Sequence, residues 1–193
     1  MIKYFSTDEI KQGTPEWHKI REGLLTGTDA YDILDGKSYQ EIISKKVNNN
    51  FTGNYYTRRG HILEDEAREI YSEVYSKVQE FGFIKNDKYP LCGYSPDGII
   101  TQEKNNIGLW ECKAFNKERH PKVYKSLDAH VLAQIQFGLM MTELPWCDLT
   151  LYNPDMENIE DTFLIKRIYP MREVIDHLIE ALGEMFLELQ KSS

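Results

Sequence analysis

Cysteine is scarce in this sequence, and its scarcity excludes two classes of protein. The 193-residue chain has three cysteines, Cys92, Cys112 and Cys147, with no CxxC pair and no histidine at a zinc-ligand spacing. A zinc site or a disulfide framework is therefore not expected, and the cysteines are predicted to be reduced, buried residues of a cytoplasmic protein. The N-terminus shows no apolar signal segment, and the chain has no internal repeat or low-complexity stretch.

Long apolar runs and excess positive charge are also missing. The most apolar stretch, residues 131–141, is interrupted by Gln134 and Gln136, so no membrane span is predicted. Lys and Arg number 23 against 31 Asp and Glu, which gives a net charge of −8. Proteins that coat nucleic acid are normally basic, so a passive coat role is disfavoured. An enzyme that holds nucleic acid in one lined channel is compatible with this charge. The length and the 41% hydrophobic content predict one domain, residues 1–193.

What the sequence does contain is a predicted β-hairpin near its middle. The first strand, residues 91–100, includes Asp97 within a Pro-Asp-Gly break, and a polar turn is predicted over residues 102–108. The second strand carries Glu111 and Lys113. Alternate residues of a strand point to the same face, so these two side chains are expected to lie together.

Two acids and a lysine among apolar neighbours are costly to bury without partners. A divalent cation would offset the repulsion between Asp97 and Glu111, and Lys113 would stabilise an anionic nucleophile or transition state. The pattern Pro-Asp, gap, Glu-x-Lys resembles the PD-(D/E)xK nuclease signature. The plainer alternative is an ordinary hairpin with a surface Glu–Lys pair.

A candidate anion site is predicted near the N-terminus. A helix opening at Thr14-Pro15 places Trp17 and Arg21 on one face, and Thr26 and Thr28 precede a second helix. Hydroxyls and free N–H groups at a helix start bind anions well. The alternatives are plain helix capping by the threonines and a surface ion pair for Arg21.

Two further polar residues lie on predicted helices. Glu64, on a helix over residues 55–77, lies at the edge of the apolar stripe. It either pairs with Arg68 one turn later or points inward to help hold a metal, and we favour the second. Gln136, on a helix over residues 128–142, is either a satisfied core amide or a group that points into a catalytic cavity.

The remaining predicted elements are helices over 39–48 and from Pro170 onward, a loop over 48–54, strands over 78–84, 146–152 and 162–168, and a basic, irregular connection over 116–125. The last helix is predicted to present an unbroken apolar stripe to the core. His120, in the basic connection, is a candidate for contact with phosphate.

Short motifs follow one another from Trp17 to Pro170: Trp17-His18-Lys19-Ile20-Arg21 with Gly23 and Thr26-Gly27-Thr28; Gly60-x-x-x-Glu64-x-x-Ala67-Arg68; Ser95-Pro96-Asp97-Gly98; Glu111-Cys112-Lys113; Ala133-Gln134-Ile135-Gln136-Phe137 with Thr142; and Tyr152-Asn153-Pro154-Asp155. In this order they resemble the phage exonuclease family typified by lambda exonuclease and the YqaJ-type viral recombinases. Two departures are Ala114-Phe115, where Cys-Pro often follows the lysine, and Thr28, where serine is common.

The resemblance implies an α/β fold, a central mixed β-sheet flanked by helices with a restriction-endonuclease-like PD-(D/E)xK core. It implies Mg²⁺, as two ions with Mn²⁺ as an alternative, bound by Asp97, Glu111, the Cys112 carbonyl and Glu64. Lys113 would orient or activate the attacking water, and Gln136 would help to position it. The implied pocket for a 5′-phosphate consists of Arg21, Thr26, Thr28 and Ser95.

The function expected from the resemblance is a Mg²⁺-dependent 5′→3′ exonuclease that acts on double-stranded DNA ends and leaves a 3′ single strand for recombination. The family implies a ring-shaped homotrimer around DNA and a single-strand annealing partner, in the host bacterial cytoplasm if the chain is phage-encoded. Lys117, Arg119 and Lys122 are candidates for the DNA side. The alternatives are a structure-specific or restriction-type endonuclease of the same fold and a catalytically silent DNA-end-binding protein.

Overall fold

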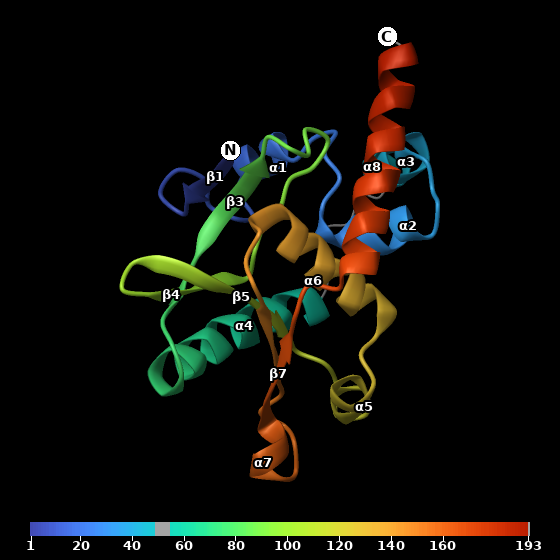
Figure 1. Ribbon diagram of the computed structural model, residues 1–193. Helices are drawn as coiled ribbons and strands as arrows, with labels where there is room; N and C mark the ends of the chain where they lie inside the picture. The colour runs from blue at the N-terminus through green and yellow to red at the C-terminus, as the bar shows by residue number, and fades with distance from the viewer. Residues whose placement is uncertain (49–54, 193) are drawn as a thin grey trace.

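A five-stranded mixed sheet lies at the centre of the structure, a computed structural model that describes residues 1–48 and 55–192 (Figure 1). Its strands run in the order β2 (Val78–Gln79), β4 (Gly98–Gln102), β5 (Asn105–Lys113), β6 (Cys147–Tyr152) and β7 (Phe163–Ile168). Only β5 and β6 pair in parallel, and the other neighbours in this sheet are antiparallel. The predicted α/β fold with a central mixed sheet is therefore confirmed.

Helices cover both faces of this sheet. The helices are α1 (Pro15–Ile20), the short 3₁₀ helix η1 (Gly27–Asp29), α2 (Ala30–Leu34), α3 (Tyr39–Asn48), α4 (Tyr55–Val74), α5 (His120–Lys125), α6 (Ala129–Thr142), α7 (Ile159–Thr162) and α8 (Arg172–Ser192). On one face, α4 packs Leu63, Ala67 and Tyr71 around Trp110 of β5. On the other face lies α6, which in turn contacts α2 and α8 (Figure 1).

Local sequence explains where the helices that frame the site begin. The Thr14 side chain accepts a hydrogen bond from the Trp17 N–H, and Pro15 follows it, so α1 begins with both of its expected signals. The Asp128 carboxylate caps α6 by accepting the N–H of His130 at 2.9 Å. The predictions for α3, α6, β6 and β7 agree with the structure within one or two residues.

The predicted hairpin exists, but its limits differ from the expected ones. Residues 91–95 form only isolated bridges, and β4 begins at Gly98, directly after Asp97. The turn consists of Glu103 and Lys104, with φ values of 49° and 69°, rather than residues 102–108. Gly108 lies inside β5, where a Cβ atom would approach the Trp146 ring to 2.4 Å. Close packing, and not a turn, accounts for this glycine.

The prediction of a single strand over residues 78–84 is wrong. It divides at Glu80 into β2, which pairs with β4, and β3 (Phe81–Asn86), which pairs with β1 (Ile2–Ser6) in a separate two-stranded sheet. Glu80 turns toward Arg68 of α4 and forms an ion pair at 2.8 Å. This division places the N-terminal segment beside β3 and, through Gln12, next to the bend that precedes β4.

Two other expectations need correction. The basic connection contains the helix α5, and His120 is fully buried with its Nε2 atom 2.8 Å from the Asp161 carbonyl oxygen, so it cannot contact phosphate. The stripe on α8 is only partly buried: Leu178 and Leu182 lie in the core, but Ile179 is 39% exposed. No helix in the described ranges is long and apolar enough to cross a membrane.

Candidate active site

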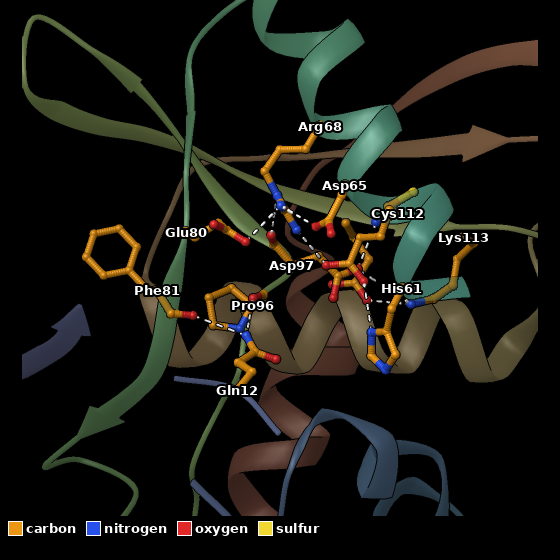
Figure 2. A network of polar contacts seen from close by, with 12 residues as sticks. Gln12, His61, Asp65, Arg68, Glu80, Phe81, Pro96, Asp97, Cys112 and Lys113 are labelled. Carbon is orange, nitrogen blue, oxygen red and sulfur yellow. Dashed lines mark hydrogen bonds and ion pairs between the residues drawn. The ribbon is translucent and has the colours of Figure 1, made fainter. Parts of the chain in front are cut away.

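Asp97 occupies the bend that leads into β4, where backbone contacts fix it. Its Oδ2 atom accepts the N–H of Cys112 on β5 at 2.9 Å. The preceding peptide is held by Gln12, whose side-chain amide donates to the carbonyl oxygens of Pro96 at 2.8 Å and Phe81 at 3.1 Å (Figure 2). The N-terminal segment thus braces the Pro-Asp break, a role that the sequence analysis did not predict for Gln12.

Glu111 is fully buried on β5, and three side chains satisfy its carboxylate. Lys113 and Gln134 each donate to Oε1 at 2.6 Å, and the Tyr94 hydroxyl donates to Oε2 at 3.2 Å. Burial and the negative charge of Asp97 raise the pKa of Glu111 to about 7, although Lys113 opposes this shift. The predicted pairing of Glu111 and Lys113 on one face of the strand is confirmed.

Lys113 is the cation that both acids share. Its Nζ atom lies 2.6 Å from Glu111 Oε1 and 3.9 Å from Asp97 Oδ2. Burial lowers the pKa of Lys113, but the negative charges of Glu111 and Asp97 outweigh it and hold that pKa above its ordinary value. The lysine therefore stays charged, and the alternative of a surface Glu–Lys pair is wrong, because Glu111 has no exposed surface.

Glu64 approaches Asp97 from the other side of the sheet, on α4. Its Oε1 atom accepts a hydrogen bond from Arg68 at 2.8 Å, so the expected i,i+4 pair forms. Burial and the negative charge of Asp97 nevertheless raise the pKa of Glu64 to about 8, against the opposing effect of Arg68. Both interpretations of Glu64 thus describe part of its environment, and its role as a metal ligand stays a prediction.

The placement of Gln136 in the catalytic cavity is wrong. Its side chain accepts the N–H of Met171 at 2.7 Å and donates to the Tyr169 carbonyl at 3.1 Å, which ties α6 to the segment before α8. The glutamine that reaches the acids is Gln134, two residues earlier on the same helix. Gln136 is therefore a core amide whose hydrogen bonds are satisfied, which was the alternative interpretation of this residue.

The predicted anion site is partly assembled around Ser95. Its Oγ atom lies 2.8 Å from Trp17 Nε1 and 3.2 Å from Arg21 Nη1, and the Arg21 guanidinium stacks on the Trp17 ring at 4.0 Å. No ion pair of Arg21 is found within residues 1–48 and 55–192, so the surface-pair alternative is wrong. Burial lowers the pKa of Arg21, with Asp29 acting in the opposite direction.

The two threonines behave differently from each other. Thr26 is buried at the N-cap position of η1, where the Asp29 carboxylate accepts both its N–H and its hydroxyl at Oδ2, at 2.7 and 2.9 Å. Thr28 is exposed, with its hydroxyl 3.2 Å from that of Thr26. Capping therefore accounts for Thr26, and Thr28 is the more accessible hydroxyl.

Lys46 belongs to the same cluster, although sequence patterns did not single it out. From the last turn of α3 its Nζ atom reaches Asp29 Oδ2 at 2.6 Å, the Leu24 carbonyl at 2.8 Å and Thr26 Oγ1 at 3.3 Å. The cluster thus has two cations, Lys46 and Arg21. Three other basic residues were predicted for the DNA side. Of these, Lys117 and Lys122 are exposed near α5, whereas Arg119 pairs with Asp128 at 2.9 Å.

A cavity of about 1200 Å³ is lined by two of the acids, Asp97 and Glu64, whereas Glu111 has no exposed surface. Its walls are the N-terminal segment that includes Gln12, the Glu64 side of α4, and the Pro96-Asp97 bend, and Trp17 lies on its border. The cavity therefore extends from Asp97 and Glu64 to Trp17, whose Nε1 atom donates a hydrogen bond to Ser95 of the Arg21–Ser95 cluster. Ser95 and Asp97 are separated by a single residue.

The donor chemistry of the acids fits a hard divalent cation. Asp97, Glu111, Glu64 and the Cys112 carbonyl offer only oxygen, which Mg²⁺ prefers. Among the described residues, no three acidic, histidine or cysteine side chains are already arranged to hold a metal ion. Glu64 is paired with Arg68, and Glu111 is paired with Lys113. A cation at Asp97 and Glu111 would take over the charge compensation that Lys113 provides.

Asp97, Glu111 and Lys113 lie together on the mixed sheet, as the resemblance to the PD-(D/E)xK signature predicted. The model of the YqaJ-like viral recombinase domain matches residues 16–145, and the chain belongs to this family.

Solved structures show the same fold. An alkaline exonuclease from Laribacter hongkongensis is 24% identical, with a TM-score of 0.77 over 93% of this chain and 94% of that one, and its complex with dAMP matches equally. A phage-related exonuclease from Haemophilus somnus is 13% identical, with a TM-score of 0.57 over 90% of this chain and 98% of that one. An uncharacterised protein of Acanthamoeba polyphaga mimivirus is 26% identical over 72% of this chain, which spans only 29% of that relative.

Proposed function

We propose that this protein is a Mg²⁺-dependent 5′→3′ exonuclease that degrades one strand of linear double-stranded DNA and leaves a 3′ single strand for recombination. The observation that carries this proposal is the short link between its two sites. Ser95, which contacts Arg21, lies two residues before Asp97 in the segment braced by Gln12. A terminal phosphate held at Arg21 would thus be held at a fixed spacing from the acids.

The residues of the chain have separable tasks in this reaction. Asp97, Glu111 and the Cys112 carbonyl would hold one Mg²⁺, and Glu64 would complete the site of a second. Bound Mg²⁺ supplies Lewis-acid activation of water and neutralises charge on the phosphate. Lys113 would stabilise the anionic charge beside Glu111, and Gln134 orients the Glu111 carboxylate.

Two alternatives have different signatures. An endonuclease of the same fold would cut closed circular duplex, and a silent DNA-end-binding protein would cut nothing. The presence of both acids and the lysine in contact argues against the silent form. The test is digestion of 5′-phosphorylated linear duplex beside covalently closed circular duplex, with Mg²⁺ and with chelator. We expect nucleotide release from the linear substrate alone, and only with Mg²⁺.

Arg21→Ala is expected to remove a preference for 5′-phosphate over 5′-hydroxyl ends. Each cycle of an end-digesting enzyme creates a new 5′-phosphate, and a guanidinium can hold it through two parallel hydrogen bonds. Rates on two end-labelled duplexes, one of each kind, give the preference. We expect a wild-type preference of about tenfold, the size of one charge-assisted hydrogen bond, to fall to near one in the variant.

Arg172→Ala serves as the control for Arg21, because it removes an exposed arginine that pairs with Asp176 on α8 and has no proposed role in DNA binding. Equal digestion of both ends by the wild type, with unchanged behaviour of Arg21→Ala, would favour the endonuclease alternative.

A ring-shaped homotrimer is part of the proposal. An acidic chain with a net charge of −8 repels DNA over most of its surface, and a closed ring would confine DNA next to exposed Lys117 and Lys122. Light scattering at working concentration is expected to give three times the mass of the chain. A monomer mass would contradict the ring.

A single-strand annealing protein is the proposed partner that receives the 3′ strand.

A further inference from the structure

The guanidinium of Arg68, on α4, contacts four oxygen-bearing groups (Figure 2). Nη2 donates to Glu64 at 2.8 Å, and Nη1 lies 2.9 Å from Asp65 and 2.8 Å from Glu80. Nε donates to the backbone carbonyl of Asp97 at 3.3 Å. The arginine therefore contacts two of the residues in the proposed metal site and touches none of the atoms that would react.

The four groups come from three separate segments. Two of them lie on α4, Glu80 lies between β2 and β3, and Asp97 lies in the bend before β4. The side chain of Arg68 is 13% exposed, and its guanidinium lies 5.7 Å above the ring of buried Trp110. A planar group with five fixed donors suits such a junction, whereas a lysine ammonium has one donor atom and cannot span it.

The contact with Glu64 engages only one of its two oxygens. Oε1 accepts from Arg68, and Oε2 has as its neighbour His61 Nδ1 at 3.9 Å, beyond hydrogen-bond distance. Arg68 thus fixes the direction of this carboxylate and leaves one oxygen for another partner. The same guanidinium fixes the backbone of Asp97, so a single rigid group sets the relation between the two acids.

We propose that Arg68 is a positioning residue for the divalent cation, which it serves by orienting Glu64 and the Asp97 backbone toward the cation. This inference rests on the proposed function. Groups that orient metal ligands typically contribute 10–100-fold to metal affinity. Loss of Arg68 is therefore expected to weaken cation binding by about tenfold or more, with the rate at saturating Mg²⁺ largely regained.

The experiment measures Mn²⁺ binding without DNA, through the spectroscopic signal of free Mn²⁺, and the Mg²⁺ dependence of linear-duplex digestion. The variants are Arg68→Gln and Arg68→Lys, and the control is Arg59→Gln on the same helix, because Arg59 pairs with Asp155 rather than with an acid of the proposed site. We expect weaker Mn²⁺ binding and a higher half-saturating Mg²⁺ concentration for both Arg68 variants. Arg59→Gln should match the wild type.

The Glu64→Gln background separates positioning from a general structural role. If Arg68 acts largely through Glu64, the change caused by Arg68→Gln shrinks in that background, since coupled residues are not additive. Should Arg68→Gln fail to fold, Arg68→Lys carries the test. Unchanged or tighter Mn²⁺ binding, wild-type behaviour of Arg68→Lys, or full additivity with Glu64→Gln would overturn the inference. A wild type that neither binds Mn²⁺ nor digests DNA would overturn the proposed function with it.

Discussion

Asp97→Asn is expected to abolish Mg²⁺-dependent digestion of linear duplex while the protein stays folded. The substitution removes a carboxylate charge from the proposed cation site but keeps an oxygen that can accept the Cys112 N–H. A cation that polarises water and phosphate contributes several kcal/mol to the transition state, so we expect a loss of about a thousandfold or more. The measurement is the initial rate of nucleotide release at saturating Mg²⁺.

The control for this variant is Asp8→Asn, which removes another aspartate from the border of the same cavity. Burial and, after it, the charge of Asp97 raise the pKa of Glu64 and Glu111, and the second effect means that these carboxylates repel Asp97. We therefore expect the metal-free Asp97→Asn protein to unfold at a temperature no lower than that of the wild type. Substantial Mg²⁺-dependent digestion by folded Asp97→Asn would refute the assignment of Asp97 to the cation site.

The acids and the lysine could be predicted from sequence because strand geometry is local. The alternation that puts Glu111 and Lys113 on one face needs no knowledge of the rest of the molecule. The role of Asp97 could be predicted from its Pro-Asp-Gly context, but the position of the hairpin turn could not. Two residues with positive φ, Glu103 and Lys104, form that turn in place of the asparagines and glycine that usually do.

The glutamine on α6 could not be assigned because this helix has no polar face. Residues 135 to 142 are all buried, so the apolar period that orients a surface helix is weak here. Sequence spacing placed Gln136 on the same face as Leu132 and Leu139. However, the elements that pack around α6 determine which glutamine contacts β5. Gln134 meets it, and Gln136 meets the segment before α8.

Lys46 shows a different limit of prediction. A lysine in the last turn of an amphipathic helix is typical of a solvated surface, and nothing near it in sequence indicates otherwise. Its partners Leu24, Thr26 and Asp29 lie 17 to 22 residues earlier. Only the packing of α3 against the segment after α1 brings these groups together, and that packing is a tertiary property.

Lys113→Ala is expected to bind DNA but to turn over about a hundredfold more slowly or worse. The ammonium lies 2.6 Å from Glu111 and 3.9 Å from Asp97, next to the position where negative charge develops in the proposed reaction. Single-turnover rates and DNA affinity are measured separately, with Lys122→Ala as the control, since that lysine is exposed outside the acidic site. The control should weaken binding slightly and leave the single-turnover rate unchanged.

The same variant also tests whether Lys113 supplies, in the metal-free protein, the positive charge that the cation would bring to the two acids. Removing it leaves the buried Glu111 carboxylate with neutral donors only, Gln134 and Tyr94, so the metal-free protein should be less stable. Mg²⁺ would then supply the missing positive charge, and it should raise the melting temperature of Lys113→Ala more than that of the wild type. Normal turnover with weakened DNA affinity would instead make Lys113 a simple phosphate contact. Equal stabilisation of both proteins by Mg²⁺ would mean that lysine and cation do not share the two acids.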